Sequence, residues 1–220
     1  MLTVFLDLDG TLIDPKPGIT ASIRHALNEM GMTDLPEPDD LTWCIGPPLW
    51  GSFEVLLGPG ADVDAAVAAY RAHFTEEGMY DAEVYDGVGE MFETLHDLGA
   101  TCHVATSKPA TYAAEIIEHF GIHAHVEQLF GSELNGTRSD KTDLLTHALN
   151  TLELDPAQAV MVGDRRFDIF GARNTNIIAI GAMWGYGEDG ELHMAEADAL
   201  AGAPEEVPEI ALDLLGLTVD

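Results

Sequence analysis

The stretch Val4-Phe5-Leu6-Asp7-Leu8-Asp9-Gly10-Thr11 decides how the rest of this 220-residue chain is interpreted. Its apolar first half is typical of a buried strand. Side chains two residues apart in an extended chain point to the same side, so Asp7 and Asp9 should project together. Gly10 allows a sharp turn directly afterwards, where Thr11 offers a hydroxyl group and a backbone N–H. Adjacent carboxylates repel each other unless a cation or a proton lies between them, so the stretch predicts a site for a hard divalent ion.

The acidic pair also fits two other interpretations. An ordinary turn favours Asp and Gly, so the pair could end a strand without any function. A calcium-binding EF-hand loop can contain D-x-D-G, but its twelfth residue would here be Gly18 instead of Glu. The EF-hand interpretation is therefore excluded, and the rest of the chain must decide between a turn and a site.

Charge and composition argue against several classes of protein. Nine Lys and Arg residues against 39 Asp and Glu residues give a formal net charge of −30, which argues against nucleic-acid polymers and anionic membranes as partners. Cys44 and Cys102 lie far apart and form neither a disulfide framework nor a metal-ligand cluster. The first apolar run stops at Asp7 and has no basic flank, so we expect no signal peptide, no membrane span and a cytoplasmic location.

The pattern of apolar residues changes along the chain. Residues 15–83 carry only helical patterns, whereas the part from residue 86 onward alternates between helices and short apolar strands. The expected strands after the first one are residues 101–106, 126–131, 159–163 and 177–182, and the expected helices are residues 88–98, 110–120, 141–152 and 165–174. Such alternation predicts an α/β fold with a doubly wound parallel sheet. We predict a core of residues 1–14 and 84–220, with residues 15–83 inserted as an all-helical cap domain.

Four polar stretches should meet at one edge of this sheet, because ligands of open α/β sheets bind beyond the carboxyl ends of the strands. These stretches are residues 7–11, residues 106–108, the helix start at Lys141, and residues 163–168. Together they supply carboxylates, hydroxyl groups and cations. This combination predicts a site for a metal ion and a phosphate group.

The same stretches resemble the four motifs of the haloacid dehalogenase superfamily of phosphatases. The first motif, DxDGT, appears as Asp7-Leu8-Asp9-Gly10-Thr11. The second, a Thr or Ser that ends a strand, matches Thr106, which is followed by Ser107-Lys108-Pro109. The third, a lysine at a helix start, matches Lys141, and the fourth, GDxxxD, matches residues 163–168. The resemblance covers nearly the whole chain. It is specific because the four motifs occur in the family's order and at predicted strand ends and helix starts.

The resemblance implies a chemical role for particular residues. Asp7 would attack phosphorus and form an aspartyl phosphate, and Asp9 would protonate the leaving group and then activate water. Thr106 and Lys141 would hold the phosphoryl oxygens, and Lys141 would also restrain Asp7. The remaining contacts to the substrate would come from Gly10, Thr11, Ser107 and Lys108.

The resemblance also implies Mg²⁺ as the cofactor. Its ligands would be Asp7, the backbone carbonyl of Asp9, and Asp164. Asp168 would orient the groups around the metal without binding it directly. We assign no role to Arg165 and Arg166, which we expect in a solvated turn.

Other activities of the superfamily differ at specific positions. Dehalogenases lack the second acidic residue of the first motif, which is present here as Asp9. Phosphonatases need a cap lysine for a Schiff base, and the predicted cap contains only Lys16, at its very start. Sugar-phosphate mutases keep Asp9 and remain an alternative, as does a phosphate-binding module without turnover.

Short strings outside the motifs suggest a substrate class. GSELNGTRSDK (131–141), GDRRFDI (163–169) and WGYG (184–187) resemble a branch named phosphoglycolate phosphatase or 5′-nucleotidase. A cap cation should meet the second anion of phosphoglycolate, but Arg24 and Arg71 lie in helices that should face solvent. Trp43, Trp50 and Phe53 could stack on a base, although core packing is the more common role for such residues. We therefore predict a small phosphorylated metabolite as the partner, a nucleotide more than phosphoglycolate.

Overall fold

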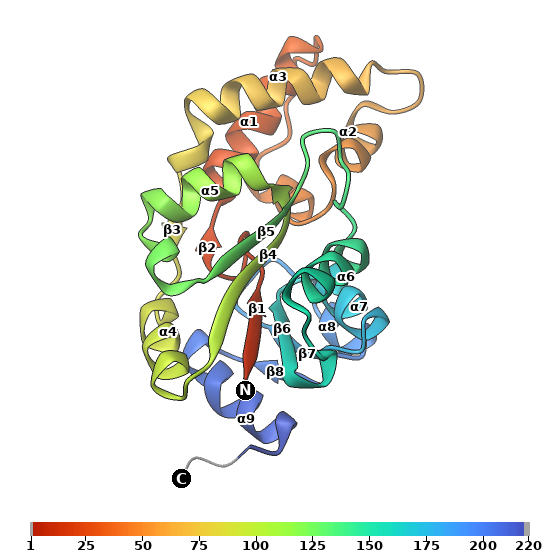
Figure 1. Ribbon diagram of the computed structural model, residues 1–220. Coiled ribbons are helices and arrows are strands. Elements are labelled where there is room, and N and C mark those ends of the chain that lie inside the picture. Colours follow the sequence, from red (N-terminus) through yellow and green to blue (C-terminus); the bar gives the residue numbers. More distant parts are fainter. Residues whose placement is uncertain (1, 218–220) are drawn as a thin grey trace.

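A parallel sheet of six strands forms the centre of the molecule in the computed structural model, which describes residues 2–217 (Figure 1). The strands lie in the order β5-β4-β1-β6-β7-β8. Their bounds are β1 (Thr3–Leu6), β4 (Thr101–Pro109), β5 (Gln128–Ser132), β6 (Ala159–Gly163), β7 (Ile178–Ala182) and β8 (Ala199–Ala201). In β1, Val4 lies opposite Cys102 of β4 and Val160 of β6. The strands that precede the first, second and fourth motifs are therefore direct neighbours.

Helices cover both faces of this sheet. One face carries α4 (Val88–Asp97), α5 (Ala110–His119) and α9 (Val207–Leu215), and the other carries α6 (Lys141–Leu152), α7 (Arg166–Asn174) and α8 (Glu191–Met194). Alternation along β1 explains both layers, since Val4 and Leu6 belong to the apolar cluster of the first face and Phe5 to that of the second. The predicted doubly wound α/β fold is confirmed.

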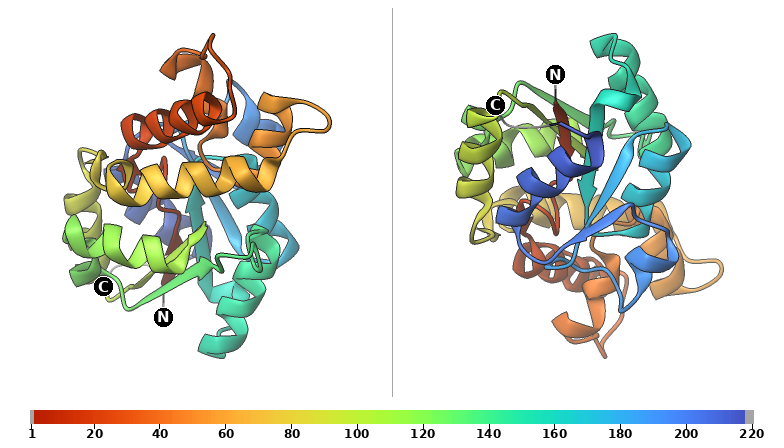
Figure 2. Two further views of the ribbon diagram at one scale, coloured as in Figure 1. Left: turned by 90° about the horizontal axis from the view of Figure 1, so that it is seen from above. Right: turned by 90° about the horizontal axis from the view of Figure 1, so that it is seen from below.

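A helical block, residues 16–80, lies above the carboxyl ends of the strands (Figure 1). It contains α1 (Lys16–Glu29), α2 (Leu49–Leu57), α3 (Val63–Glu76) and two 3₁₀ helices, Pro38–Cys44 and Gly78–Tyr80. Helices α1 and α3 pack side by side, as the view from above shows (Figure 2). The chain leaves the core at β2 (Ile13–Asp14) and returns at β3 (Glu83–Val84), and these two strands pair antiparallel. Treating residues 15–83 as a separate cap domain remains a prediction.

The structure differs from the predicted elements mainly toward the C-terminus. Strand β8 and helix α8 were not predicted because they have only three and four residues. Helix α9 was also missed, although its nine residues carry apolar side chains at helical spacing, with Val207 and Ala211 buried. Strand β4 continues past Thr106 to Pro109, and its register with β5 shifts between these two residues. Further 3₁₀ helices occur at Ile122–His125, Pro156–Gln158 and Pro204–Glu206. Residue 1 and residues 218–220 of the predicted core lie outside the described residues.

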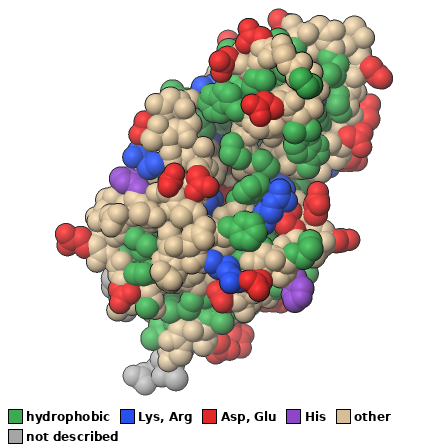
Figure 3. All heavy atoms as spheres, turned by 90° about the vertical axis from the view of Figure 1, so that its right-hand side faces the viewer, with side chains coloured by type: hydrophobic (Ala, Val, Ile, Leu, Met, Phe, Trp, Pro, Cys, Tyr) green, Lys and Arg blue, Asp and Glu red, His purple; other side chains and the backbone are tan. Residues whose placement is uncertain are grey.

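Acidic side chains are spread widely over the surface (Figure 3). In this view Asp and Glu lie over the upper, middle and lower parts, whereas the visible Lys and Arg side chains lie mostly around the middle. Within residues 2–217, no helix combines the length and the apolar character needed to cross a membrane. The net charge of −30 should repel free anions over a distance of about a Debye length, ~10 Å.

Candidate active site

The floor of the candidate site is a buried ion-pair group where β1 ends. Asp7 directly follows β1 and is 5% exposed, and its backbone N–H donates to the carbonyl of Val162 at 2.9 Å. Lys141 is the first residue of α6 and is 4% exposed. Its Nζ lies 3.1 Å from Asp7 Oδ1 and 2.7 Å from Asp168 Oδ1. The same ammonium group donates to the carbonyl of Ala105 in β4 at 2.8 Å. Lys141 therefore connects β4 to the carboxylates of Asp7 and Asp168 through one ammonium group.

The charge state of Lys141 follows from these contacts. Burial alone would lower the pKa of this ammonium group, but Asp168 and Asp7 outweigh burial and raise its pKa above the ordinary value. Lys141 is therefore protonated at neutral pH. The predicted pairing of Lys141 with Asp7 is present in the structure as a distance, while its role in catalysis remains a prediction.

Three carboxylates gather at the floor. Asp7, Asp164 and Asp168 are all buried and each offers an oxygen within 4.8 Å of the others. Asp164 accepts hydrogen bonds from the Tyr186 backbone N–H at 2.7 Å and from the Thr11 hydroxyl at 3.4 Å. Burial, followed by the charges of Asp168 and Asp7, raises the pKa of Asp164 well above its usual range. Oxygen ligands that repel one another in a buried site fit a hard divalent cation.

The metal prediction and the geometry agree on two carboxylates and differ on a third. Asp7 and Asp164, both predicted ligands, belong to the cluster. Asp168, which we expected around the metal shell, belongs to it as well, and its Oδ2 accepts a hydrogen bond from the Arg165 backbone N–H at 3.1 Å. The side chain of Asp9 pairs elsewhere, so Asp9 could reach this cluster only through its backbone. The residues present thus fit a divalent metal, and the identity Mg²⁺ remains a prediction.

Asp9 lies beside the floor and pairs with Lys108. Its Oδ1 accepts a hydrogen bond from Lys108 Nζ at 2.8 Å, and both side chains are at most 10% exposed. Burial raises the pKa of Asp9 and the neighbouring Lys108 partly opposes this, so the carboxyl holds a proton more readily than a free Asp. A raised pKa suits a group that must donate a proton to a leaving alkoxide. Lys108 Nζ also lies 4.8 Å from the centre of the Phe74 ring in α3, so it touches both the core and the helical block.

The turn after Asp9 needs glycine for a structural reason. Gly10 has φ of +83°, and a Cβ there would lie 2.3 Å from Asp164 Oδ2. The close approach lets Asp164 reach the turn and accept the hydrogen bond from Thr11. Gly10 and Thr11, which we predicted as substrate contacts, are thus placed against Asp164, and Thr11 is 1% exposed.

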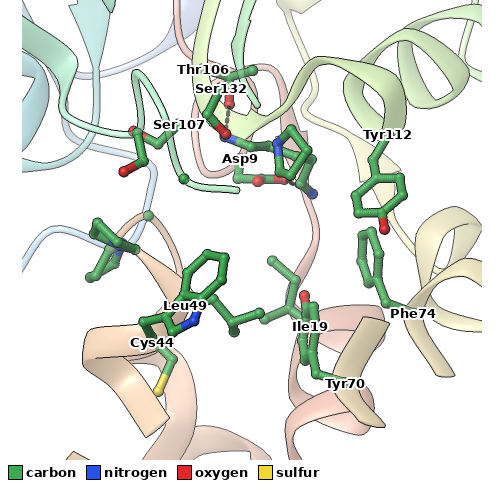
Figure 4. Close-up of a pocket in the computed structure, with 18 of the residues that line it drawn as sticks. Asp9, Ile19, Cys44, Leu49, Tyr70, Phe74, Thr106, Ser107, Tyr112 and Ser132 are labelled. Carbon is green, nitrogen blue, oxygen red and sulfur yellow. Dashed lines mark hydrogen bonds and ion pairs between the residues drawn. The ribbon is translucent and has the colours of Figure 1, made fainter. Parts of the chain in front are cut away.

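A pocket opens between the strand ends and the helical block (Figure 4). Asp7, Asp9, Thr106, Ser107 and Lys108 line its core side. The block and α5 supply the opposite side, which we call the roof: Ile19, Leu49, Trp50, Tyr70, Arg71, Phe74 and Tyr112. The roof is mainly apolar and aromatic. Five of the sequence-predicted site residues therefore face a common pocket, with Lys141, Asp164 and Asp168 packed around its floor.

Several expectations for the roof need correction. Arg71 does not simply face solvent: it lines the pocket, donates to the carbonyl of Leu134 at 2.7 Å, and places its guanidinium carbon 4.9 Å from the centre of the Trp50 ring. Of the three aromatic residues considered, Trp50 lines the pocket, Phe53 is fully buried, and Trp43 packs against the core cluster. Tyr70, Phe74 and Tyr112 could not be recognised as pocket residues from the sequence, because their spacing in helices is also that of core residues.

Arg165 is also not in a solvated turn. It is 3% exposed and contacts both Glu191 and the helical block, whereas Arg166 is largely exposed. No local pattern could have separated these neighbouring arginines, because the partners of Arg165 lie far away in the sequence.

Comparison with known proteins assigns the chain to a family. The sequence model of the haloacid dehalogenase-like hydrolases matches residues 4–182. A 5′-nucleotidase of Pseudomonas aeruginosa is 41% identical over 190 residues, which are 86% of this chain and 86% of that protein. The tyrosine-protein kinase PtkA of Mycobacterium tuberculosis is 41% identical over 184 residues, 84% of this chain but only 62% of that protein. The crystal structure of a "predicted phosphatase" from Clostridium acetobutylicum has a TM-score of 0.92 at 34% identity and covers 96% of this chain and 98% of that one.

The chain therefore belongs to the haloacid dehalogenase-like hydrolases. The predicted enzyme class, a phosphatase of this family, is confirmed at the level of the class. Enzymes of this family generally use a divalent metal ion, and the buried Asp cluster provides oxygen ligands for one.

Proposed function

We propose that this protein is a Mg²⁺-dependent phosphomonoesterase that hydrolyses a small organic phosphate through an aspartyl phosphate on Asp7. The observation that carries the proposal is the buried Asp7 carboxylate, 3.1 Å from the ammonium group of Lys141, at the floor of a pocket open to the helical block. A carboxylate held beside a fixed cation can attack phosphorus while the cation offsets charge on the phosphoryl oxygens.

Each step can be assigned to a residue of the site. Asp7 attacks phosphorus, the ester oxygen leaves, and Asp9 donates the proton that this oxygen needs. Asp9 then takes a proton from the water that attacks the aspartyl phosphate, which releases inorganic phosphate and restores Asp7. Thr106, Ser107 and Lys108, which line the core side of the pocket, would donate hydrogen bonds to the phosphoryl oxygens. Throughout these steps, the positive charge of Lys141 offsets the negative charges of Asp7 and Asp168.

The metal would be held by Asp7, the backbone carbonyl of Asp9, and Asp164, with Asp168 beside them. When bound, Mg²⁺ supplies positive charge that reduces the repulsion between the nucleophilic carboxylate and the phosphate group. The carboxylate cluster supports this assignment. Lys141 offsets part of the repulsion among the three carboxylates, and a divalent cation would offset the rest.

The roof supports a substrate with an aromatic or otherwise apolar organic group. The two cations that line the pocket are already engaged: Lys108, on the core side, pairs with Asp9, and Arg71, at the roof, bonds to the carbonyl of Leu134 and stacks on Trp50. A second anion such as the carboxylate of phosphoglycolate would therefore have to displace an existing contact. Trp50 and Tyr112, both partly exposed, instead offer ring surfaces on which a nucleobase could stack. We infer that residues 15–83 act as a cap and that a 5′-nucleotide fits better than phosphoglycolate.

The names of the relatives do not identify the substrate, since a 5′-nucleotidase and a tyrosine-protein kinase are both 41% identical to this chain over the aligned residues. The experiment that tests the function is phosphate release from 5′-mononucleotides, phosphoglycolate and sugar phosphates, each with Mg²⁺ or EDTA. We expect Mg²⁺-dependent release, fastest with a mononucleotide, and a loss of about 10³-fold or more in Asp7→Asn.

Asp143→Asn provides the matched control, because Asp143 is an exposed carboxylate in the first turn of α6. It should keep the wild-type rate. Release that persists in a purified Asp7→Asn protein would disprove the nucleophile. Formation of an isomerised sugar phosphate without release of phosphate would favour the mutase alternative.

A further inference from the structure

Arg165 joins the core to the helical block directly beside the carboxylate cluster. It follows Asp164 in the loop between β6 and α7, and its guanidinium group points away from the cluster toward the block. Nη1 donates a hydrogen bond to the carbonyl of Ile45 and lies 3.5 Å from the carbonyl of Trp43. Both carbonyls are at the end of the 3₁₀ helix Pro38–Cys44, where backbone acceptors lack intrahelical partners. The arginine therefore satisfies acceptors of the block from within the core.

Glu191 fixes the other edge of this guanidinium group. Its Oε1 accepts a hydrogen bond from Arg165 Nε at 3.1 Å and from the Arg166 backbone N–H at 2.8 Å, and its Oε2 accepts one from the Glu188 backbone N–H at 3.1 Å. Burial would raise the pKa of Glu191, but these backbone donors and Arg165 outweigh burial and lower it. Glu191 is thus ionised and rigidly held, which limits the orientations open to Arg165.

The segment that Arg165 contacts leads directly into the pocket wall. Gly46 passes over the arginine so closely that a Cβ there would lie 2.9 Å from Arg165 Cγ. The residues that follow, Pro47, Pro48, Leu49 and Trp50, all line the pocket. The backbone N–H of Arg165 meanwhile donates to Asp168 Oδ2 at 3.1 Å. One residue is therefore attached to the floor by its backbone and to the roof by its side chain.

We propose that Arg165, held by Glu191, is a positioning residue that fixes residues 43–50 over the phosphate site and thereby sets the affinity for the organic part of the substrate. A buried guanidinium group is stable only when its donors are satisfied. The guanidinium group of Arg165 bonds to Ile45 in the helical block and to Glu191 in the core. If the block moved away, the guanidinium group would lose an acceptor and the carbonyl of Ile45 would lose its donor. The contact therefore favours the arrangement in which the roof covers the floor. The kinetic part of this proposal rests on the proposed function.

Arg165→Met tests the proposal, and Arg173→Met is the matched control. Arg173 lies in helix α7, which begins directly after Arg165, and pairs with Glu196 on the surface. In hydrogen exchange, we expect peptides that cover residues 43–50 to exchange about tenfold faster in Arg165→Met, while peptides of β1 and β6 remain unchanged. KM for a 5′-mononucleotide should rise about tenfold, as expected when hydrogen bonds to a charged group are lost. KM for acetyl phosphate, whose organic part has only two carbons, should change less than about twofold.

Two results would overturn the proposal: unchanged exchange at residues 43–50 in folded Arg165→Met, or an equal rise in KM for both substrates. If Arg165→Met does not fold, Arg165→Lys decides, because lysine keeps the charge beside Glu191 but cannot donate in the same fork. Faster exchange confined to residues 43–50 supports the proposal in that variant, and wild-type exchange contradicts it. The exchange measurement does not need turnover, so a failure of the proposed function, seen as no phosphate release by the wild type, would be recognised separately.

Discussion

The floor of the pocket is built from charged side chains of the core, whereas its roof is built from apolar and aromatic side chains of the helical block and α5. At the floor, Asp7, Asp164, Asp168 and Lys141 are each at most 5% exposed. The three carboxylates lie close together, and Lys141 pairs with Asp7 and Asp168. At the roof, the partly exposed Trp50 and Tyr112 offer ring surfaces, and Arg71 is already bonded to a backbone carbonyl. In the proposed mechanism, the floor acts on the phosphate group, which all phosphate esters share. The roof would meet only the organic part, which differs between esters, so the roof should determine selectivity.

This contrast predicts that changes at the floor affect every substrate, whereas changes at the roof affect some substrates and mainly KM. Variants at the floor and at the roof can therefore test this division of roles. A floor variant with selective effects, or a roof variant with uniform effects, would show that the two regions do not divide the work in this way.

The largest effect should come from Lys141→Met, which keeps most of the side-chain volume and removes the ammonium group. Asp7 and Asp168 would then be buried without their partner, so the free energy of unfolding should fall by about 3–5 kcal/mol. Phosphate release should fall by about 10³-fold for all esters, because the nucleophile loses its fixed cation. Thermal unfolding and single-turnover phosphate release measure the two effects.

Lys16→Met is the control for this variant, since Lys16 is a partly exposed lysine paired with Asp39 on the surface. Loss of such a pair should change stability by at most ~1 kcal/mol. A Lys141→Met protein with near-wild-type turnover would show that the floor does not depend on this ion-pair group.

Asp164→Asn should change stability in opposite directions with and without metal. In EDTA the variant should unfold at a higher temperature than the wild type, because one of three repelling carboxylates is neutral. With Mg²⁺ the stabilisation that the wild type gains from the ligand should be lost. Thermal unfolding in EDTA and in Mg²⁺, with Asp143→Asn as the control, tests both signs. A metal-dependent rise in Tm that persists in Asp164→Asn would remove this residue from the metal site.

The same carboxylate predicts a pH dependence of the metal-free protein. Burial and neighbouring carboxylates raise the pKa of Asp164 in the folded state, whereas in the unfolded state its pKa is about 4. The folded state therefore binds more protons above about pH 4, so this group's contribution to stability is lost as pH rises. In EDTA, Tm of the wild type should fall more steeply with rising pH than Tm of Asp164→Asn. Parallel curves would contradict the raised pKa.

A smaller and selective effect should come from Trp50→Ala at the roof. KM for a 5′-mononucleotide should rise about tenfold, since a stacked base contributes ~1–3 kcal/mol, while KM for acetyl phosphate should hardly change. Val55→Ala is the control, because Val55 lies on the same helix, α2, with 71% of its surface exposed. Steady-state kinetics on both substrates measure the effect, and an equal loss on both would contradict the division between floor and roof.

The smallest effect concerns the acidic surface, which surrounds both regions. A protein with a net charge of −30 should repel anionic esters, so added salt at fixed Mg²⁺ should raise kcat/KM about two- to threefold by screening. Trp50→Ala should show the same salt dependence as the wild type, because the repulsion comes from the whole surface. A fall in kcat/KM, or no change, would argue against electrostatic repulsion as a limit on substrate encounter.

Much of the core could be predicted from the sequence because its signals are local. Strand β6 (Ala159–Gly163) and helix α6 (Lys141–Leu152) were predicted with the observed bounds, since an apolar run and an amphipathic period define them within a few residues. Strand β8 was missed because its three residues are held by pairing with β7, which no local pattern reveals.

In the candidate site, too, some residues could be predicted from local sequence signals and others could not. The floor could be predicted from the sequence, because Asp7, Lys141 and Asp164 are charged residues directly after apolar strands or at a helix start, where parallel strands must bring them together. The roof and the contact made by Arg165 became visible only in the folded chain. The guanidinium group of Arg165 bonds to a carbonyl 120 residues away. Tyr70 lines the pocket, yet it is buried and spaced along α3 like the core residues Ala66 and Val67. Such contacts depend on how the helical block packs on the sheet, and the hydrophobic packing that sets this arrangement does not distinguish, within the sequence, a pocket wall from a core.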